Sequence, residues 1–210
     1  MNDDSTSQES KRLAALLGSM DRNLLEHDTD TIYTVWRDLS LAYMNAGWDR
    51  FASENEGVPS ITEQWGIPRN IMDAVAESLR PFYQSLFERA AQEADPLHPV
   101  QHEYECSSPE HYRRFLMSIY NLNNQGFLVV HSLITEQPHD ENQRPAHEVR
   151  EYLYVKPNGI VTQCAHCRRI RVVGKEEIWH WVPDWVRTPP PNVSHGLCRL
   201  CAEYYFGPLE

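Results

Sequence analysis

The sequence predicts an α+β protein that ends in a small metal-binding module, and two observations lead to this fold class. The first is a change of hydrophobic period: two strand-like stretches precede a long helical stretch, and three more follow it. The second is a pair of Cys-x2-Cys motifs near the C-terminus, formed by Cys164, Cys167, Cys198 and Cys201. The patterns divide the chain into an N-terminal helix, a mixed domain, a linker and a cysteine module, with expected bounds 1–28, 29–134, 135–150 and 151–210.

The composition is that of an acidic globular protein. Of the 210 residues, 41% are hydrophobic and 23% are charged, and the formal net charge is −11. An acidic surface repels nucleic-acid phosphates, which disfavours nucleic acid as a partner. The polar start MNDDSTSQES lacks the apolar segment of a secretory signal, and no apolar run approaches the roughly 18 residues of a membrane helix. We therefore expect a cytoplasmic protein with reduced thiols and no membrane partner.

Residues 1–28 are expected to contain an amphipathic helix. Apolar residues recur there at i, i+3, i+4, i+7 and i+11, which places them on one stripe: Leu13, Leu16, Leu17, Met20 and Leu24. Such a stripe either covers a sheet edge or pairs with a second copy of itself. The second alternative predicts a homodimer through this helix.

The mixed domain begins with two strands. Residues 31–38 (TIYTVWRD) are rich in β-branched and aromatic residues, and residues 41–44 (LAYM) follow after a short turn. Residues 69–94 form the longest helical stretch, in which Pro81 is expected to cause a kink or break. Two strands with period two follow, at 100–106 and 113–121, and a nearly all-apolar stretch at 127–134 predicts a central strand covered on both faces.

The C-terminal part begins with a polar segment that has two prolines and no period, residues 135–150, which we interpret as a linker. Residues 152–155 and 160–163 flank a Pro-Asn-Gly turn and are expected to form a hairpin. This hairpin would lead directly into the first cysteine pair.

Two Cys-x2-Cys loops can direct four thiolates onto one ion, which is the donor set of a closed, structural zinc site. The first pair follows a strand, as in a zinc knuckle, and the second precedes an expected helix at 202–206. With the intervening strands this predicts a treble-clef-like module. We favour all-cysteine ligation, with His195 as an alternative metal ligand or a hydrogen-bond donor to a thiolate.

Catalysis is not expected. Four thiolates leave no open position on zinc, and the sequence contains no hydrolase, P-loop, dinucleotide-binding or metalloprotease motif. A thiol redox switch, in which oxidation releases zinc, stays open. Arg168, Arg169 and Arg171 form a basic spot beside the first pair. They are either a salt-bridged surface or, in the alternative interpretation, the nucleic-acid contact of a zinc-finger regulator.

Two resemblances extend this interpretation. The segments CAHCRRIR, WHWVPDW and SHGLCRLC resemble a cysteine-rich, zinc-binding tail of bacterial signalling proteins. The segments LAYMNAGWDRFA and HEYECSSPEHYRRFLMSIYNLNNQGFLVVHSL resemble the second and the last three strands of a PAS sensor domain. The resemblance implies a five-stranded antiparallel sheet with helices on one face. It also implies a sensory or protein-interaction module in signal transduction, with a signalling partner that the sequence does not identify.

A PAS-like domain would hold a ligand between its sheet and its helices. The candidates to line this cavity are Trp36, Tyr43, Phe82, Phe115, Met117 and Val129. The alternative is that these side chains simply fill the core. Haem would need an axial histidine such as His102 or His131, and a cysteine-linked flavin would need a cysteine in a helix, whereas Cys106 lies on a strand. The PAS ligand stays unknown.

Overall fold

The computed structural model describes residues 3–55 and 65–208, with side chains from residue 10 onward in these ranges. The chain divides into two compact units. The first comprises Met1–Val75, Tyr83–His102 and Leu116–Ser132. The second comprises Ala76–Phe82, Glu103–Phe115 and Leu133–Glu210.

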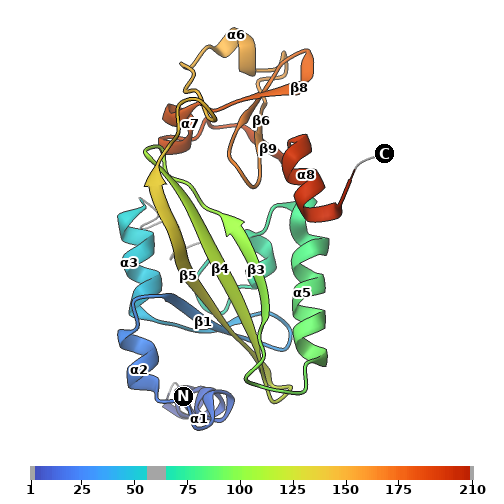
Figure 1. Ribbon diagram of the computed structural model, residues 1–210. Helices are drawn as coiled ribbons and strands as arrows, with labels where there is room; N and C mark the ends of the chain where they lie inside the picture. Colours follow the sequence, from blue (N-terminus) through green and yellow to red (C-terminus); the bar gives the residue numbers. More distant parts are fainter. Residues whose placement is uncertain (1–2, 56–64, 209–210) are drawn as a thin grey trace. The chain divides into compact units, whose positions relative to one another are not determined.

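A five-stranded sheet has the strand order β2-β1-β5-β4-β3 (Figure 1). Its strands are β1 (Thr31–Trp36), β2 (Leu41–Met44), β3 (Val100–Glu105), β4 (His111–Leu122) and β5 (Gly126–Pro138). Strand β1 lies antiparallel to both β2 and β5. Asn123 and Asn124, both with positive φ, turn the chain between β4 and β5. The expected five-stranded antiparallel sheet is therefore confirmed.

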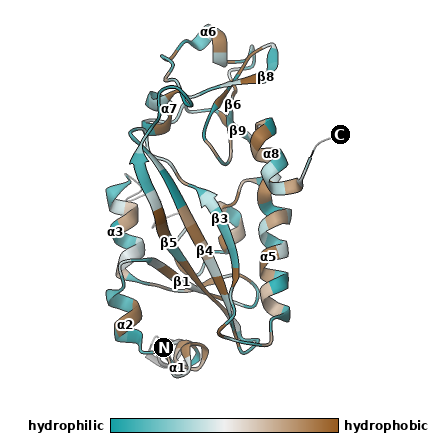
Figure 2. Ribbon diagram, viewed as in Figure 1, coloured by the Kyte–Doolittle hydropathy of each residue, from teal (hydrophilic) through white to brown (hydrophobic). Residues whose placement is uncertain are grey.

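The register of β1 on β5 assigns residues to the two faces of the sheet. Tyr33 lies opposite Val129, and Thr34 lies opposite Leu128, so these two pairs face opposite sides. Side chains on both sides are buried, with Val129 and Thr34 both fully inaccessible. Figure 2 shows hydrophobic residues concentrated on β1, β4 and the first part of β5. Both faces of this sheet are thus covered by other parts of the chain.

One face is covered by the N-terminal helices α1 (Asp3–Leu17) and α2 (Arg22–His27). Leu16 is buried there in one cluster with Ile32, Leu122 and Leu128. The expected single helix is in fact two, because Gly18 has a φ of +58° that ends α1 and Asp21 caps α2 through the amide of Asn23. Leu13, Leu16 and Met20 of the apolar stripe therefore pack on a face of the sheet and not on its edge, whereas Leu24 is exposed.

The other face is covered by α5 (Arg80–Gln92), whose Phe87 ring lies 5.3 Å from that of Phe127 on β5. The sheet therefore carries helices on both faces, which corrects the expectation of helices on one face. The reason is that a strand such as β5, with Phe127, Leu128 and Val129 all buried, exposes apolar surface on both sides.

Asn45 connects three elements around the start of α3 (Ala46–Glu54). Its side-chain oxygen accepts hydrogen bonds from the amides of Ile32 and Trp48, at 2.9 and 3.0 Å. Its side-chain nitrogen donates to the carbonyls of Leu25 and Asp30. The asparagine is fully buried, and both lone pairs of its oxygen and both N–H groups of its side chain are used in these four hydrogen bonds.

The long helical stretch is interrupted, as Pro81 predicts. Two 3-10 turns, η1 (Ile71–Ala74) and η2 (Glu77–Leu79), precede α5. The break lies directly before Pro81, as expected, and Pro81 is tolerated in the first turn of α5, where no carbonyl partner exists for its missing N–H.

Two expectations for the C-terminal part are wrong. Residues 135–138 belong to β5 instead of an irregular segment. Residues expected as the first strand of a hairpin form a helical turn, α6 (Glu151–Tyr154), and only an isolated bridge joins Val155 to Val161. Burial of the Tyr154 side chain in an apolar cluster outweighs the weak strand pattern of so short a segment.

The second unit contains a four-stranded sheet with the order β8-β7-β6-β9. Its elements are β6 (Val161–Cys164), β7 (Ile170–Val172), β8 (Lys175–His180), α7 (Pro183–Arg187), β9 (Val193–Gly196) and α8 (Arg199–Phe206). Strands β6 and β9 are parallel, and β7 is antiparallel to its two neighbours. Among the described residues, no helix has the length and apolar character needed to cross a membrane.

Candidate metal centre

Four cysteine sulfurs converge in the second unit. The Sγ atoms of Cys164, Cys167, Cys198 and Cys201 all lie within 4.8 Å of one another, and no disulfide joins them. A zinc ion bound to four sulfurs at about 2.3 Å would place them at the corners of a tetrahedron with edges of about 3.8 Å. The Sγ atoms of Cys167 and Cys198 are 3.7 Å apart. The residues present therefore fit a tetrahedral metal ion.

A tight turn after β6 positions the first pair. Cys164 ends β6, and its amide donates to the carbonyl of Arg169 at 2.8 Å. Arg168 has a φ of +59°, and its amide donates back to the carbonyl of Cys164. The amide of Ala165 donates to the carbonyl of Gly196, which ties this turn to β9. The chain thus forms a knuckle that turns both thiols inward.

The start of α8 positions the second pair. Cys198 is the N-cap residue of α8, and Cys201 lies in its first turn. The amide of Cys198 lies 3.5 Å from the Sγ of Cys164. A helix N-terminus favours negative charge, so thiolates are stabilised at these positions. The expected short helix is confirmed and begins three residues earlier than the predicted 202.

The electrostatics of the four thiols favour a bound cation. All four side chains are buried, with residue exposures between 0 and 7%. Hydrogen bonds from the Cys167, Cys198 and Cys201 thiols lower the pKa of Cys164. The same hydrogen bonding to Cys164 raises the pKa of Cys201. The hydrogen bonds of the cluster thus favour thiolate at some positions and thiol at others, whereas a dication would stabilise all four as thiolates.

The two histidines of this region lie outside the sulfur cluster. His195 is exposed on β9, and the group of potential metal ligands among the described residues does not contain it. His166 lies between the first two cysteines, but its Nδ1 is 2.6 Å from the hydroxyl of Tyr205. His166 therefore points away from the sulfurs, as expected.

A buried ion pair supports the same unit, and sequence reasoning missed it. The guanidinium of Arg144 makes two hydrogen bonds to the carboxylate of Glu105, at 2.7 and 3.0 Å, and both side chains are about 10% exposed or less. Arg144 also lies over the ring of Trp181, at 4.7 Å from its centroid. Burial alone would lower the pKa of Arg144, but the hydrogen bonds and charge of Glu105 raise it. No local pattern marks this arginine, because it lies in a polar segment that reads as a linker.

The basic spot beside the knuckle is dispersed. Arg171 lies 3.7 Å from the Glu176 carboxylate and 6.0 Å from the centroid of Trp179. Arg168 and Arg169 are half-buried in the knuckle turn. This arrangement fits the interpretation of a salt-bridged surface at Arg171.

The six expected cavity-lining residues occupy different environments. Trp36 packs in the cluster around Leu16, and the Tyr43 hydroxyl donates to Glu26 of α2, so both face the N-terminal helices. In the second unit, Phe82 packs edge-on against Tyr205 and Phe115 stacks on Tyr104. Met117 and Val129 are buried in the first unit. The structure therefore does not bring the six around one space.

An aromatic group that the sequence interpretation missed lies on the Val129 face of the sheet. The ring of Tyr33 is 5.4 Å from Trp48 and 5.5 Å from His131. The His131 Nε2 is 3.4 Å from the Tyr33 hydroxyl. Burial lowers the pKa of His131 to about 4, so this imidazole is neutral at pH 7. The alternation of Tyr33 with Ile32 and Thr34 could have indicated that Tyr33 faces this side.

Three kinds of known protein were compared with the chain: family models, curated proteins and solved structures. No protein-family model and no curated protein matches the chain. Among solved structures, the crystal structure of the PAS domain of an HTR-like protein from Haloarcula marismortui is similar, with 17% identity and a TM-score of 0.33. The match covers 63% of this chain and 97% of that one. At this TM-score the likeness carries no argument, so the interpretation depends on strand order and on the sulfur cluster.

Proposed function

We propose that the chain is a non-catalytic sensory or protein-interaction module of bacterial signal transduction, stabilised by a structural zinc ion. The observation that carries this proposal is the closed cluster of four buried sulfurs. Four thiolates would fill the coordination shell of zinc, which suits a scaffold and leaves no site for substrate. The β2-β1-β5-β4-β3 order agrees with the PAS-like domain implied by the sequence resemblance.

We propose that the metal module is treble-clef-like, and three features support this. The knuckle between β6 and β7 supplies two cysteines, β7 and β8 form a hairpin, and α8 supplies the other two. An all-sulfur, near-tetrahedral donor set favours Zn²⁺ over harder cations such as Mg²⁺ or Ca²⁺. We therefore assign zinc to this site and give it a structural role.

Native mass spectrometry of the purified chain tests the proposal, because one spectrum reports metal stoichiometry, bound small molecules and oligomeric state. We expect one zinc ion per chain, lost in Cys167→Ser and retained in Cys106→Ser. Cys106 is the matched control, since it lies outside the sulfur cluster and burial raises its pKa. A metal-free, folded wild-type chain would contradict the structural role.

A homodimer through the N-terminal helix stays a prediction. Leu16 and Leu17 are buried within one chain, at 4 and 5% exposure, so they are not free to pair with a second copy in this arrangement. Substituting Leu16 or Leu17 with Asp would unfold the sheet. The appropriate test is therefore the mass of the wild-type chain, measured by light scattering. A dimeric mass would require another surface or an exchange of α1.

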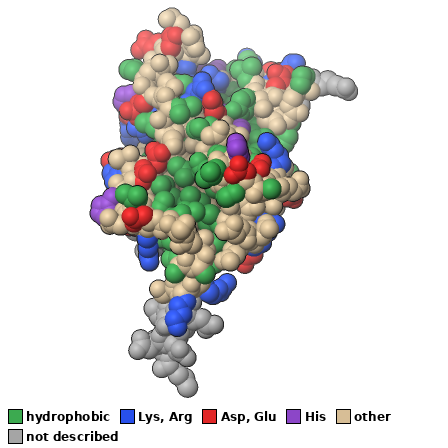
Figure 3. All heavy atoms as spheres, turned by 60° about the horizontal axis from the view of Figure 1, so that its bottom comes forward, with side chains coloured by type: hydrophobic (Ala, Val, Ile, Leu, Met, Phe, Trp, Pro, Cys, Tyr) green, Lys and Arg blue, Asp and Glu red, His purple; other side chains and the backbone are tan. Residues whose placement is uncertain are grey.

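No observation favours the nucleic-acid alternative. On the face drawn in Figure 3, acidic and basic side chains are interspersed, with no continuous basic field. The net charge of −11 opposes phosphate binding. We therefore expect no binding to duplex DNA at moderate ionic strength. Salt-sensitive binding of DNA that is weakened in Arg168→Gln would support the nucleic-acid alternative.

A further inference from the structure

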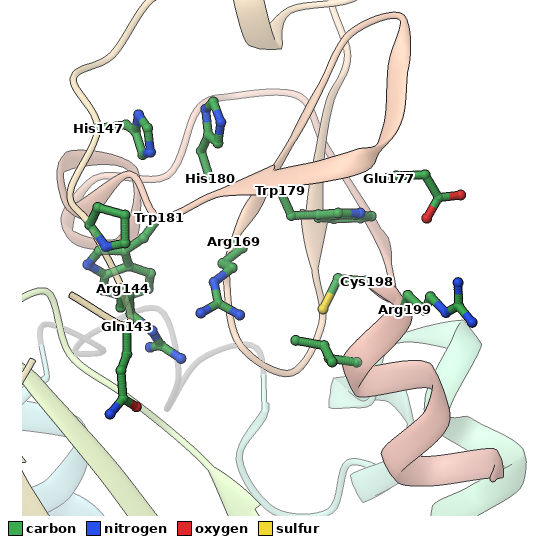
Figure 4. Close-up of a pocket in the computed structure, with 12 residues that line it drawn as sticks. Gln143, Arg144, His147, Arg169, Glu177, Trp179, His180, Trp181, Cys198 and Arg199 are labelled. Carbon is green, nitrogen blue, oxygen red and sulfur yellow. The ribbon is translucent and has the colours of Figure 1, made fainter. Parts of the chain in front are cut away.

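A cleft of about 310 Å³ opens within the second unit, beside the sulfur cluster (Figure 4). Its walls come from the segment around Arg144 and His147, from the knuckle residue Arg169, from Trp179 and His180 of β8, and from the start of α8. The volume lies at the lower end of the range for small-molecule sites, about 300 to 1,000 Å³. Its lining combines aromatic rings with three guanidinium groups and one carboxylate, that of Glu177, and this excess of positive charge points to an anionic ligand that carries a ring.

One of the three guanidinium groups at this cleft is available. Arg144 is engaged by both oxygens of Glu105, and Arg199 donates to Glu203 at 2.8 Å. Arg169 makes no ion pair with any residue that the structure describes. Figure 4 shows its guanidinium extending into the open space between Arg144 and Cys198. A planar guanidinium with free donors binds a carboxylate through two parallel hydrogen bonds.

The rings that line the cleft are held in place. The imidazoles of His147 and His180 stack with centroids 3.8 Å apart and planes within 4°. Tyr154 fixes the pair through its hydroxyl, 3.0 Å from the His180 Nδ1. The Trp179 Nε1 donates to the carbonyl of Glu176, which fixes the indole next to the cysteines. Rings fixed in this way lose little side-chain entropy when a ligand packs against them.

We propose that this cleft binds a small aromatic carboxylate, with the carboxylate on Arg169 and the ring against Trp179 and the paired imidazoles. A single available guanidinium suits a monoanion better than a phosphate dianion. The site belongs to the metal-binding unit and not to the five-stranded sheet. It is therefore independent of any ligand of the PAS-like domain and of the signalling role proposed above.

A competing role for Arg169 is to balance the charge of the metal-bound thiolates. That role also explains a cation beside Cys198, but it requires no ligand in the cleft. The two roles differ in what each substitution changes. Charge balance predicts that Arg169→Gln weakens metal retention, whereas a ligand site predicts that Arg169→Gln retains the metal and loses the ligand.

The experiment is a titration of the metal-loaded chain with phenylacetate, phenylacetamide and acetate, followed through the indole N–H signals in ¹H–¹⁵N spectra. We expect phenylacetate to shift the Trp179 signal with a dissociation constant below about 1 mM. The amide lacks the charge and acetate lacks the ring, so each should bind at least tenfold more weakly. Arg169→Gln should weaken phenylacetate binding at least tenfold, Arg169→Lys less, and Arg168→Gln, a neighbour outside the cleft lining, not at all.

Three results would overturn the proposal. Phenylacetate could leave the Trp179 signal unmoved at 10 mM, or the amide could bind as well as the acid. Arg169→Gln and Arg168→Gln could also behave alike. Metal content is measured on every variant. If Arg169→Gln loses the metal, Arg169→Lys, which keeps the positive charge, is used to test ligand binding instead. Loss of metal in Arg169→Gln together with no phenylacetate binding by the wild-type chain would assign Arg169 to charge balance.

Discussion

The two units of this chain are stabilised by different means. The first holds most of the five-stranded sheet, with helices on both faces, and fully buried apolar residues such as Val35, Ile119 and Val129 supply its stabilisation. In the second, the strands of the β8-β7-β6-β9 sheet have three to six residues, and a sulfur cluster and a buried ion pair add to the apolar cluster around Tyr154. A sheet of short strands encloses little apolar area, so such cross-links contribute a larger share of its stability.

The largest expected effect comes from removing the metal. Binding of zinc by four thiolates contributes on the order of 10 kcal/mol in small zinc modules. Treatment with a chelator, or Cys201→Ser, should therefore unfold the β8-β7-β6-β9 sheet and leave the α1 contacts with β1 intact. Amide signals in ¹H–¹⁵N spectra would report the unfolding of the small sheet and the persistence of the α1 contacts. If the β8-β7-β6-β9 sheet kept its dispersed amide signals after complete metal removal, the second unit would not depend on metal for its stability.

The buried ion pair comes next. Arg144→Ala leaves the Glu105 carboxylate buried without its partner, which should cost about 3 to 5 kcal/mol of unfolding free energy. Arg150→Ala is the matched control, because Arg150 and Glu148 form an exposed pair in the same segment. Urea denaturation of both variants measures the difference. Equal midpoints for the two variants would show that the buried pair contributes nothing.

The apolar stripe of the N-terminal helices provides an internal comparison. Leu16 is 4% exposed, whereas Leu24 of the same predicted stripe is 69% exposed. Leu16→Ala should therefore lower the unfolding free energy by about 2 to 4 kcal/mol, and Leu24→Ala should leave it almost unchanged. A large loss of unfolding free energy in Leu24→Ala, or none in Leu16→Ala, would mean that α1 and α2 pack differently on the sheet.

The smallest effect is a dependence on pH in the first unit. The pKa of His131 is lowered to about 4 in the folded chain, against about 6.5 when unfolded. The unfolded chain therefore binds the proton more tightly, and stability present above pH 6.5 is lost as the pH falls toward 4. The contribution is at most about 3 kcal/mol. His131→Phe should flatten the stability curve in this window relative to wild type, and identical slopes would contradict the low pKa.

The same contrast explains what the sequence could predict. The sheet and the cluster of four cysteines follow from local signals: strand patterns, an Asn-Asn turn and two Cys-x2-Cys loops. The Arg144–Glu105 pair and the arrangement of Tyr33 with His131 depend on contacts between residues distant in sequence. The apolar run 127–134, in contrast, already indicated a strand covered on both faces. The expected strand at 152–155 became a helical turn because burial of Tyr154 outweighs a weak local preference.

X-ray absorption at the zinc edge of the purified chain tests the central claim most directly. If one metal ion holds the second unit together, the spectrum will fit four sulfur neighbours at about 2.3 Å and no nitrogen or oxygen neighbour. A nitrogen atom among the neighbours of the zinc ion would instead support His195 as a ligand. A folded second unit with no zinc signal would contradict the account.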